Sequence, residues 1–424
     1  MGSAGEWPLM GAIIDVAYLA GLAAASPVLV PRMIRRGKHR IDWSSRLGKG
    51  QAFAEKSAPR ILIHAVSVGE INAIRPLVDR LHSLDRPLEI VVASTTQTGL
   101  ERARSLYSDR CEVLQYPLDL SWCVRRFLDR VDPDLFASVE LEVWPNFGRA
   151  CQRRSIPQYV INGRLSERSF RGYRRVRPLV QPMFSRLDCA AVQDADYADR
   201  FRALGAEPVV VTGTMKWDGV DTPGEVAGAR ELADAMGIDR ERLLVVAGST
   251  APDEHALLKQ SVPDGVQLMC APRRPEWFED AASILDGCAR RSRGDTGSAT
   301  GRFLLDTMGE LRAAYSLADV VVVGRSFGAL HGSDMMEPAA LGKPVVVGPS
   351  TSDFQGTVKA LSEGGGLLVS TRESLAKDLA SLLGDETRRS DLSARALEVV
   401  EQNQGATDRT VDLILTKLVD RGAW

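Results

Sequence analysis

Short apolar runs alternate with helix-like segments along most of the chain. Beyond Ser57 the β-rich runs are Ile61–Val66, Leu88–Ala93, Leu135–Val139, Gln158–Ile161, Cys189–Val192 and Pro208–Val211. Segments between them, such as Thr98–Tyr107 and Ala195–Leu204, have helical patterns. Such alternation predicts βαβ units around a parallel sheet.

The pattern breaks once and then restarts. The break, Thr212–Gly224, is rich in glycine and turn formers. The runs that follow are Leu243–Ala247, Val266–Cys270, Val320–Val323, Pro344–Val347 and Gly366–Val369. We predict an α/β fold with two Rossmann-like, doubly wound domains facing a cleft, at 41–213 and 225–424, joined by a linker at 214–224. Periodicity does not fix which domain the final helix, about Asp408–Val419, packs on.

The N-terminus has a different pattern. Pro8–Val30 is almost wholly apolar, broken by Asp15, and the basic residues Arg32, Arg35, Arg36, Lys38 and Arg40 follow it. At about 1.5 Å per helical residue the run could cross a bilayer. No Lys or Arg precedes it, which disfavours a cleaved signal peptide, and the basic residues after it predict that the remainder stays in the cytoplasm. Residues 1–40 are therefore predicted to be a membrane anchor or an interfacial helix; a plain core helix is the alternative.

Composition narrows the class of protein. A chain of 424 residues exceeds the usual size of one core, and 44% hydrophobic and 25% charged residues are typical of a globular protein. The formal net charge of -2 gives no basic field for nucleic acid. The six cysteines include no C-x-x-C pair and the five histidines lack zinc spacing, so we expect reduced thiols, no metal and no cofactor.

One acidic residue is well placed for chemistry. In Ile61–Arg80 an apolar strand leads through a turn of small residues that carries Glu70 into an amphipathic helix. A carboxylate at the carboxyl end of a buried strand faces the region where open α/β sheets bind ligands. The alternative is that Glu70 only interacts with the N-terminus of its own helix.

The second half has two glycine-rich turns after strands, Ala247–Thr250 and Gly324–Gly332. Backbone N–H groups in such turns can approach phosphate, but neither turn matches a dinucleotide or Walker motif. Glu337 opens a short helix, where a carboxylate can hold two ribose hydroxyls. It could equally be a first-turn acid favoured by the helix dipole.

Several runs together resemble the GT-B glycosyltransferases, and more narrowly the Kdo transferases of lipid A assembly, which move 3-deoxy-D-manno-octulosonic acid (Kdo) from CMP-Kdo. The matching runs, in the family's order, are HAVSVGE (64–70), YPLDL (116–120), VELEVWPN (139–146), NGRLSERSFRGY (162–173), TGTMKWD (212–218), APRRPE (271–276), DTMGEL (306–311) and EPAALGKPVVVGP (337–349). The resemblance implies an inverting glycosyltransferase of lipopolysaccharide core biosynthesis. It would transfer Kdo to a lipid A precursor (lipid IVA) at the cytoplasmic face of the inner membrane.

The resemblance also implies roles for particular residues. Glu70 matches the general base, and Glu140 and Lys216 match positions that stabilise the transition state. The positions that match the CMP-binding segments are Pro272, Arg273, Met308, Gly309, Glu310, Asp334, Met335, Met336 and Glu337.

The chain departs from the family pattern in the donor loop. Ser333 stands where the family has His, and Asp334 where it has Asn; Arg325, where a Gly is usual, could compensate the added negative charge. These changes leave open a divergent or non-catalytic paralogue using another CMP sugar. A nucleotide-sugar 2-epimerase-like isomerase, which shares the two-domain fold, is a further alternative.

Overall fold

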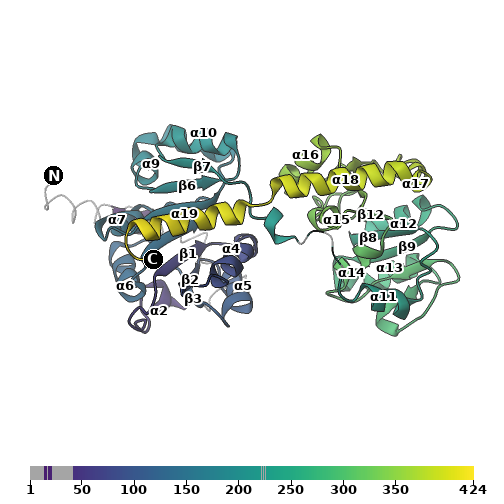
Figure 1. Ribbon diagram of the computed structural model, residues 1–424, viewed down its shortest axis with the longest axis horizontal. Coiled ribbons are helices and arrows are strands. Elements are labelled where there is room, and N and C mark those ends of the chain that lie inside the picture. The colour runs from purple at the N-terminus through teal and green to yellow at the C-terminus, as the bar shows by residue number, and fades with distance from the viewer. Residues whose placement is uncertain (1–13, 17, 22–41, 221, 223, 225) are drawn as a thin grey trace. The chain divides into compact units, whose positions relative to one another are not determined.

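The computed structural model describes residues 14–16, 18–21, 42–220, 222, 224 and 226–424. The chain divides into two compact units. Unit 1 comprises Met1–Gly219 with Gln404–Trp424, and unit 2 comprises Val220–Asn403. Figure 1 shows an α/β arrangement of helices and a sheet in each unit.

Unit 1 is built on a sheet of seven strands in the order β3-β2-β1-β4-β5-β6-β7, all paired in parallel. The strands are β1 (Arg60–Ala65), β2 (Glu89–Ser94), β3 (Glu112–Gln115), β4 (Leu135–Val139), β5 (Gln158–Gly163), β6 (Cys189–Val192) and β7 (Val209–Val211). Ile61 pairs with both Ile90 and Leu135, so β1 is central. The strand order changes direction between β1 and β4, so the loops that follow these two strands lead away to opposite sides. Open parallel sheets bind ligands at such a point, beyond the carboxyl ends of the strands.

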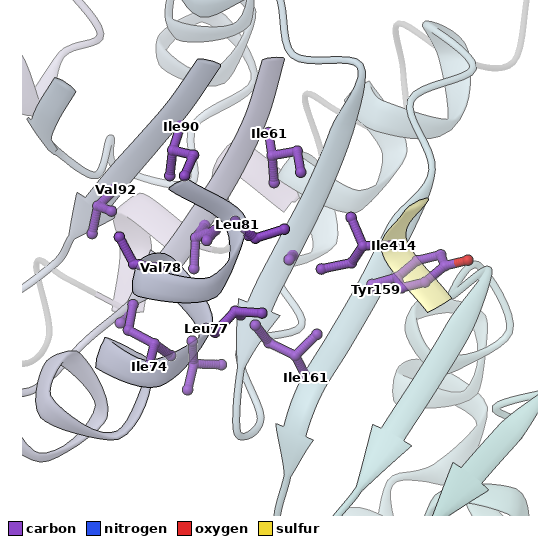
Figure 2. Close-up of a cluster of buried hydrophobic side chains, with 14 of the residues drawn as sticks. Ile61, Ile74, Leu77, Val78, Leu81, Ile90, Val92, Tyr159, Ile161 and Ile414 are labelled. Carbon is purple, nitrogen blue, oxygen red and sulfur yellow. The ribbon is translucent and has the colours of Figure 1, made fainter. Parts of the chain in front are cut away.

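Helices cover both faces of this sheet. They are α2 (Trp43–Arg46), α3 (Val68–Ala73), α4 (Arg75–His82), α5 (Gln97–Tyr107), α6 (Ser121–Val131), α7 (Pro145–Arg153), α8 (Glu167–Arg175), α9 (Arg177–Phe184), α10 (Ala195–Leu204), the short 3-10 helix η1 (Trp217–Gly219) and α19 (Ala406–Asp420). Side chains of α3, α4, α5 and α19 share one buried cluster with the strands, part of which Figure 2 shows. Those of α6, α7, α9 and α10 pack in two further clusters.

The final helix, α19, packs on unit 1. Val411, Ile414 and Leu418 lie on one helical face and are buried in the cluster of α4. Figure 2 shows Ile414 in this cluster with Tyr159, whose hydroxyl donates to the Leu413 carbonyl at 3.4 Å. The predicted range of 225–424 for the second domain therefore needs correction at its end. Burying these apolar side chains, at about 1.5–3 kcal/mol each, draws the segment back to the first sheet.

Unit 2 repeats the plan with a sheet in the order β10-β11-β9-β8-β12-β13-β14, again all parallel. The strands are β8 (Leu244–Thr250), β9 (Gln267–Pro272), β10 (Ala289–Arg290), β11 (Arg302–Leu304), β12 (Val320–Val323), β13 (Val345–Val347) and β14 (Leu368–Val369). The α-helices are α11 (Ala229–Met236), α12 (Pro252–Ser261), α13 (Phe278–Ile284), α14 (Leu311–Leu317), α15 (Met336–Ala340), α16 (Gln355–Glu363), α17 (Leu375–Leu383) and α18 (Glu386–Asn403). Short 3-10 helices lie at η2 (Pro275–Trp277), η3 (Arg291–Arg293) and η4 (Ser352–Phe354). Here the order reverses between β8 and β12.

The predicted membrane segment, Pro8–Val30, lies mostly outside the described residues. Within the described part of the chain no helix has the length and apolar character needed to cross a membrane. Asp15, which breaks the apolar run, accepts hydrogen bonds from the Ser121 backbone N–H (2.9 Å), the Ser121 hydroxyl (2.5 Å) and Asn146 Nδ2 (2.9 Å). Leu120 gives α6 no side-chain cap, so Asp15 caps this helix from a distant part of the sequence.

Candidate functional site

Glu70 is fixed in the loop after the central strand β1. Its Oε2 accepts the Val66 N–H at 2.8 Å, and its Oε1 accepts the Ser67 hydroxyl at 2.8 Å. Ser67 caps α3, since its oxygen accepts the Glu70 N–H at 3.3 Å. Glu70 thus does interact with the N-terminal region of its own helix, as the structural alternative expected. Whether the residue can also do chemistry depends on what lies near it.

Glu140 follows β4, the strand beside β1. Its φ of 58° is in the left-handed region, which is uncommon for a residue other than glycine. Its N–H donates to the Ile161 carbonyl at 3.0 Å, and its own carbonyl accepts the Arg164 N–H at 3.3 Å. These bonds hold the backbone in this conformation where strand order reverses, and such strain is typical of functional sites.

Two acids at this edge, Glu70 and Glu142, have pKa values that are shifted by burial and by neighbouring carboxylates. Burial raises the pKa of Glu70, and the charge of Glu140 raises it further, against the hydrogen bonds from Val66 and Ser67. Burial also raises the pKa of Glu142, to about 7, with smaller contributions from Glu70 and Glu140. Its Oε2 accepts the Trp144 indole N–H at 2.7 Å. Acids with raised pKa values, here Glu70 and Glu142, are suited to proton transfer near neutral pH.

Sequence reasoning did not select Glu142. It lies two residues beyond Glu140 in the run VELEVWPN, which was singled out as a whole. The signal available in the sequence was the pair of acids Glu140 and Glu142, two residues apart after a buried strand.

Lys216 lies at the same edge of the unit 1 sheet, in the loop after β7. The N–H of its neighbour Met215 donates to Oδ1 of the buried Asn162 at 3.2 Å, which ties this loop to the end of β5. The Lys216 side chain is exposed. Among the described residues its ammonium has no ion-pair partner, so it is available to an anionic ligand.

The predicted donor-binding residues all lie in unit 2. Pro272 ends β9, and the N–H of the exposed Arg273 donates to the Thr250 carbonyl at 3.0 Å, so this loop is joined to the end of β8. The side chain of Met308 is 65% exposed, and Gly309 has a φ of +94° with open space around the position of a Cβ.

Glu310 is already paired within the protein. Its Oε1 lies 2.9 Å from Arg291 Nη2, and its other oxygen accepts the Thr307 hydroxyl. Partial burial acts to raise the pKa of Glu310, but these contacts outweigh it, so the pKa is lowered. Glu310 therefore shapes the 307–310 loop, and its carboxylate is less free for a ligand than the sequence suggested.

Asp334 and Glu337 form the other part of the predicted donor site. Asp334 Oδ1 accepts the Met336 N–H at 2.9 Å, Met335 and Met336 are buried, and Glu337 lies at the start of α15, 3.8 Å from Arg312. The pKa of the buried Tyr315 is raised mainly by burial and further by the charges of Glu337 and Asp334. The charges of these two acids thus act on one buried tyrosine hydroxyl.

One glycine-rich turn does not offer the N–H groups expected of it. The carboxylate of Glu254, fully buried, accepts hydrogen bonds from the backbone N–H groups of Ala251, Arg325, Ser326 and Phe327, at 2.8, 2.8, 2.9 and 3.1 Å. The expectation that these N–H groups face phosphate is wrong for residues 325–327, because an internal anion takes the place of the ligand. Glu254 instead joins the loops after β8 and β12, where the order of the second sheet reverses.

No group of three or more His, Cys, Asp or Glu in the described ranges is arranged to hold a metal ion. The six cysteines are all free.

The chain is similar to proteins of known family. The family model described as 3-deoxy-D-manno-octulosonic-acid transferase (kdotransferase) matches residues 41–219. A 3-deoxy-D-manno-octulosonic acid transferase of Haemophilus influenzae is 32% identical over 84% of this chain and 86% of its own. One of Bordetella pertussis is 31% identical over 96% of this chain and 99% of its own.

A solved structure shares the fold. UDP-GlcNAc 2-epimerase from Neisseria meningitidis superposes on this chain with a TM-score of 0.53 at 13% sequence identity. The superposition covers 84% of this chain and 100% of the epimerase chain. At this identity the likeness concerns the fold alone, so it does not favour the isomerase alternative. The sequence relatives decide the family: this chain belongs to the 3-deoxy-D-manno-octulosonic acid transferases, which are glycosyltransferases.

Proposed function

We propose that the protein transfers Kdo from CMP-Kdo to a lipid A precursor, lipid IVA, in lipopolysaccharide core biosynthesis. The relatives named as Kdo transferases support the sugar that is moved. The observation that carries the chemistry is the group of carboxylates where the strand order of the first sheet reverses: the half-buried Glu70 has a pKa raised by burial and by the charge of Glu140.

Glu70 acts as the general base. The acceptor hydroxyl oxygen attacks the anomeric carbon of Kdo while its proton passes to the Glu70 carboxylate. The bond from that carbon to the phosphate oxygen breaks, and its electron pair leaves with CMP, so that configuration at the carbon inverts. A carboxylate whose pKa is raised toward the working pH suits this task better than an ordinary one.

Two further residues act on charge that develops during the reaction. Glu140 balances the oxocarbenium character of the sugar, and the ammonium of Lys216 balances the negative charge of the departing CMP. Both side chains come from loops at the carboxyl edge of the same sheet.

The donor is held by unit 2. The exposed guanidinium of Arg273 suits a phosphate or carboxylate, because its planar fork donates two parallel hydrogen bonds. Glu337 accepts from the ribose hydroxyls, and the backbone at Gly309 allows close approach of the nucleotide. The remaining proposed donor contacts are Pro272, Met308, Glu310, Asp334, Met335 and Met336.

The proposed location is the cytoplasmic face of the inner membrane. The apolar run at 8–30 and the basic residues after it support this placement. The number of Kdo residues added in succession is left open by this proposal.

The test is Kdo transfer to lipid IVA in detergent, with CMP-Kdo generated in place. Glu70→Gln should lower the rate by on the order of a hundredfold or more, the usual scale for a general base. Glu112→Gln, an exposed acid on the edge strand β3, is the matched control and should keep full activity. An unchanged transfer rate in Glu70→Gln would show that Glu70 is not the general base. A folded wild type that binds CMP but transfers no Kdo would instead indicate a paralogue using another CMP sugar.

A further inference from the structure

Asp218 joins the loop that carries Lys216 to the start of the last helix. This loop, residues 212–219, follows β7. Oδ1 of Asp218 accepts the Gly405 N–H at 2.6 Å, and its Oδ2 accepts the Thr407 N–H, also at 2.6 Å. We propose that Asp218 is a positioning residue, which holds this loop against α19 and thereby places the ammonium of Lys216.

The carboxylate of Asp218 takes the place of a helix cap. The first N–H groups of a helix have no partner within the helix, and a Ser, Thr, Asp or Asn at the N-cap usually satisfies one of them. The N-cap residue of α19 is Gly405, which has no side chain to do so. A negative charge at this end of a helix is also favoured by the helix dipole. The loop thus gains a fixed partner on α19.

Two further hydrogen bonds bind the same loop to the same helix. Arg409 Nε donates to the Thr212 carbonyl at 2.9 Å, and Gln404 Nε2 donates to the Trp217 carbonyl at 3.1 Å. The start of α19 therefore holds the loop at its first residue and near its last. The Lys216 side chain between these contacts is exposed, so its place is set by the backbone on either side of it.

The loop has a second attachment, on the side of the sheet. The N–H of the buried Met215 donates to Oδ1 of Asn162, at the end of β5, at 3.2 Å. Lys216 follows directly, so its backbone lies between this bond and the bonds to α19. Without Asp218, the Asn162 bond would have to hold the middle of the loop with less support from α19.

Asp218 also lies where the chain passes between the two units. Unit 1 ends its first segment at Gly219 and resumes at Gln404, so the bond from Gly405 to Asp218 joins the two crossings, one residue inside each. Loops at such places open easily unless they are bound. The inference rests on the proposed function, which gives Lys216 its charge-balancing role, and deepens it by assigning what places that charge.

The kinetic test uses the full chain in the transfer assay. Asp218→Ala should lower kcat by on the order of tenfold to a hundredfold with little change in KM for CMP-Kdo, since a small misplacement of a catalytic group is costly. Combined with Lys216→Gln, it should leave the kcat of Lys216→Gln unchanged to within about twofold, whereas independent effects would multiply. Asp218→Asn keeps one acceptor oxygen and should lose less. The control is Asp385→Ala in unit 2, which removes an exposed carboxylate that accepts the Arg388 N–H at 2.9 Å, and it should keep the full rate.

Hydrogen exchange tests the loop without any need for activity. In Asp218→Ala the amides of Gly405 and Thr407 lose their acceptor and should exchange roughly 5- to 150-fold faster. The Met215 amide should also exchange faster, although its own acceptor, Asn162, is unchanged, because the loop opens as a unit. The same Asp385→Ala control should leave all three amides as in the wild type.

A milder variant covers the case in which circular dichroism shows Asp218→Ala to be unfolded. Arg409→Gln removes the bond to Thr212 and should speed exchange at Met215 by a smaller factor. In either variant, unchanged exchange at Met215 would overturn the proposal, since Asp218 would then only cap α19. Effects on kcat that multiply in the double variant would overturn it too, because Asp218 would not act through Lys216. Full activity of Lys216→Gln alone would instead refute the role proposed for Lys216, and exchange at Met215 would still decide whether Asp218 holds the loop.

Discussion

Replacing Glu254 by glutamine should loosen the turn after β12 while keeping the size of the side chain. The two carboxylate oxygens each accept two backbone N–H groups: Oε2 those of Ala251 and Arg325, Oε1 those of Ser326 and Phe327. A glutamine has one acceptor oxygen, and its amide NH₂ would face the other pair as a donor. Two buried N–H groups therefore lose their acceptor in the variant.

The expected loss of stability is about 1–3 kcal/mol for each buried N–H group left without an acceptor, or about 2–6 kcal/mol for the two. Burial raises the pKa of Glu254, so part of this loss is offset by no longer desolvating a charge. The effect should be concentrated at the loops after β8 and β12, because the bonds join only these loops.

Hydrogen exchange followed by mass spectrometry measures the effect locally. Amides in peptides covering residues 320–335 should lose protection by roughly 5- to 150-fold, the equivalent of the cost per bond. Peptides from β1 in unit 1 should be unchanged. Glu241→Gln, an exposed acid of unit 2, is the control. Unaltered protection at residues 325–327 in a folded Glu254→Gln variant would refute the role given to these four bonds.

Three further predictions concern unit 1. The Glu142 carboxyl should titrate near 7 when followed by carbon-13 NMR. Glu70→Gln should lower the pKa of Glu142, because it removes a nearby negative charge. Trp144→Phe should raise that pKa, because it removes a hydrogen bond to the charged form of Glu142. A shift in the opposite direction would contradict the assignment of neighbours. Lys216→Gln should lower kcat by about 10²–10³ in the transfer assay if its charge stabilises departing CMP, whereas a change confined to KM would indicate ground-state binding. Ile414→Ala should lower the free energy of unfolding of unit 1 by about 2–5 kcal/mol in urea, and a negligible loss would mean that α19 does not support this unit.

Much of the fold was predictable because its central strands are buried on both faces. The residues of β1, β4, β6 and β12 are all buried, so these strands read as continuous apolar runs between helical segments. The break near Thr212 similarly reflects the boundary at Gly219 between the units. The resemblance to Kdo transferases rested on runs spread along the chain and is confirmed by relatives that cover most of it.

The strands that were not predicted lie toward sheet edges. β3 has the sequence EVLQ, with one fully buried residue, and β10 and β11 are two and three residues long. The arginines of β10 and β11 gain partners only in the folded protein. Arg290 in β10, for example, pairs with the buried Asp306 at 2.8 Å and with Glu279 at 2.6 Å. Neither pairing is visible in a hydrophobic pattern.

The candidate site shows the same division between local and distant information. Glu70 was found from its position after a strand, which is a local feature. The charge of Glu140 raises the pKa of Glu70, and that of Glu70 raises the pKa of Glu142, because β1 and β4 are neighbours, although the segments are some seventy positions apart in the sequence. Likewise, the loops joined by Glu254 follow β8 and β12, which meet only in the sheet.

Both units therefore place a carboxylate at the point where strand order reverses, but with different surroundings. In unit 1, Glu70 accepts one backbone N–H and one hydroxyl and has acidic neighbours, which leaves capacity to accept a proton. In unit 2, Glu254 accepts four backbone N–H groups and is fully buried, so its acceptor capacity is filled and substrate cannot reach it. In our proposal the same position in the fold serves proton transfer in one unit, and it serves loop geometry in the other. The number of backbone donors that face each carboxylate makes the difference.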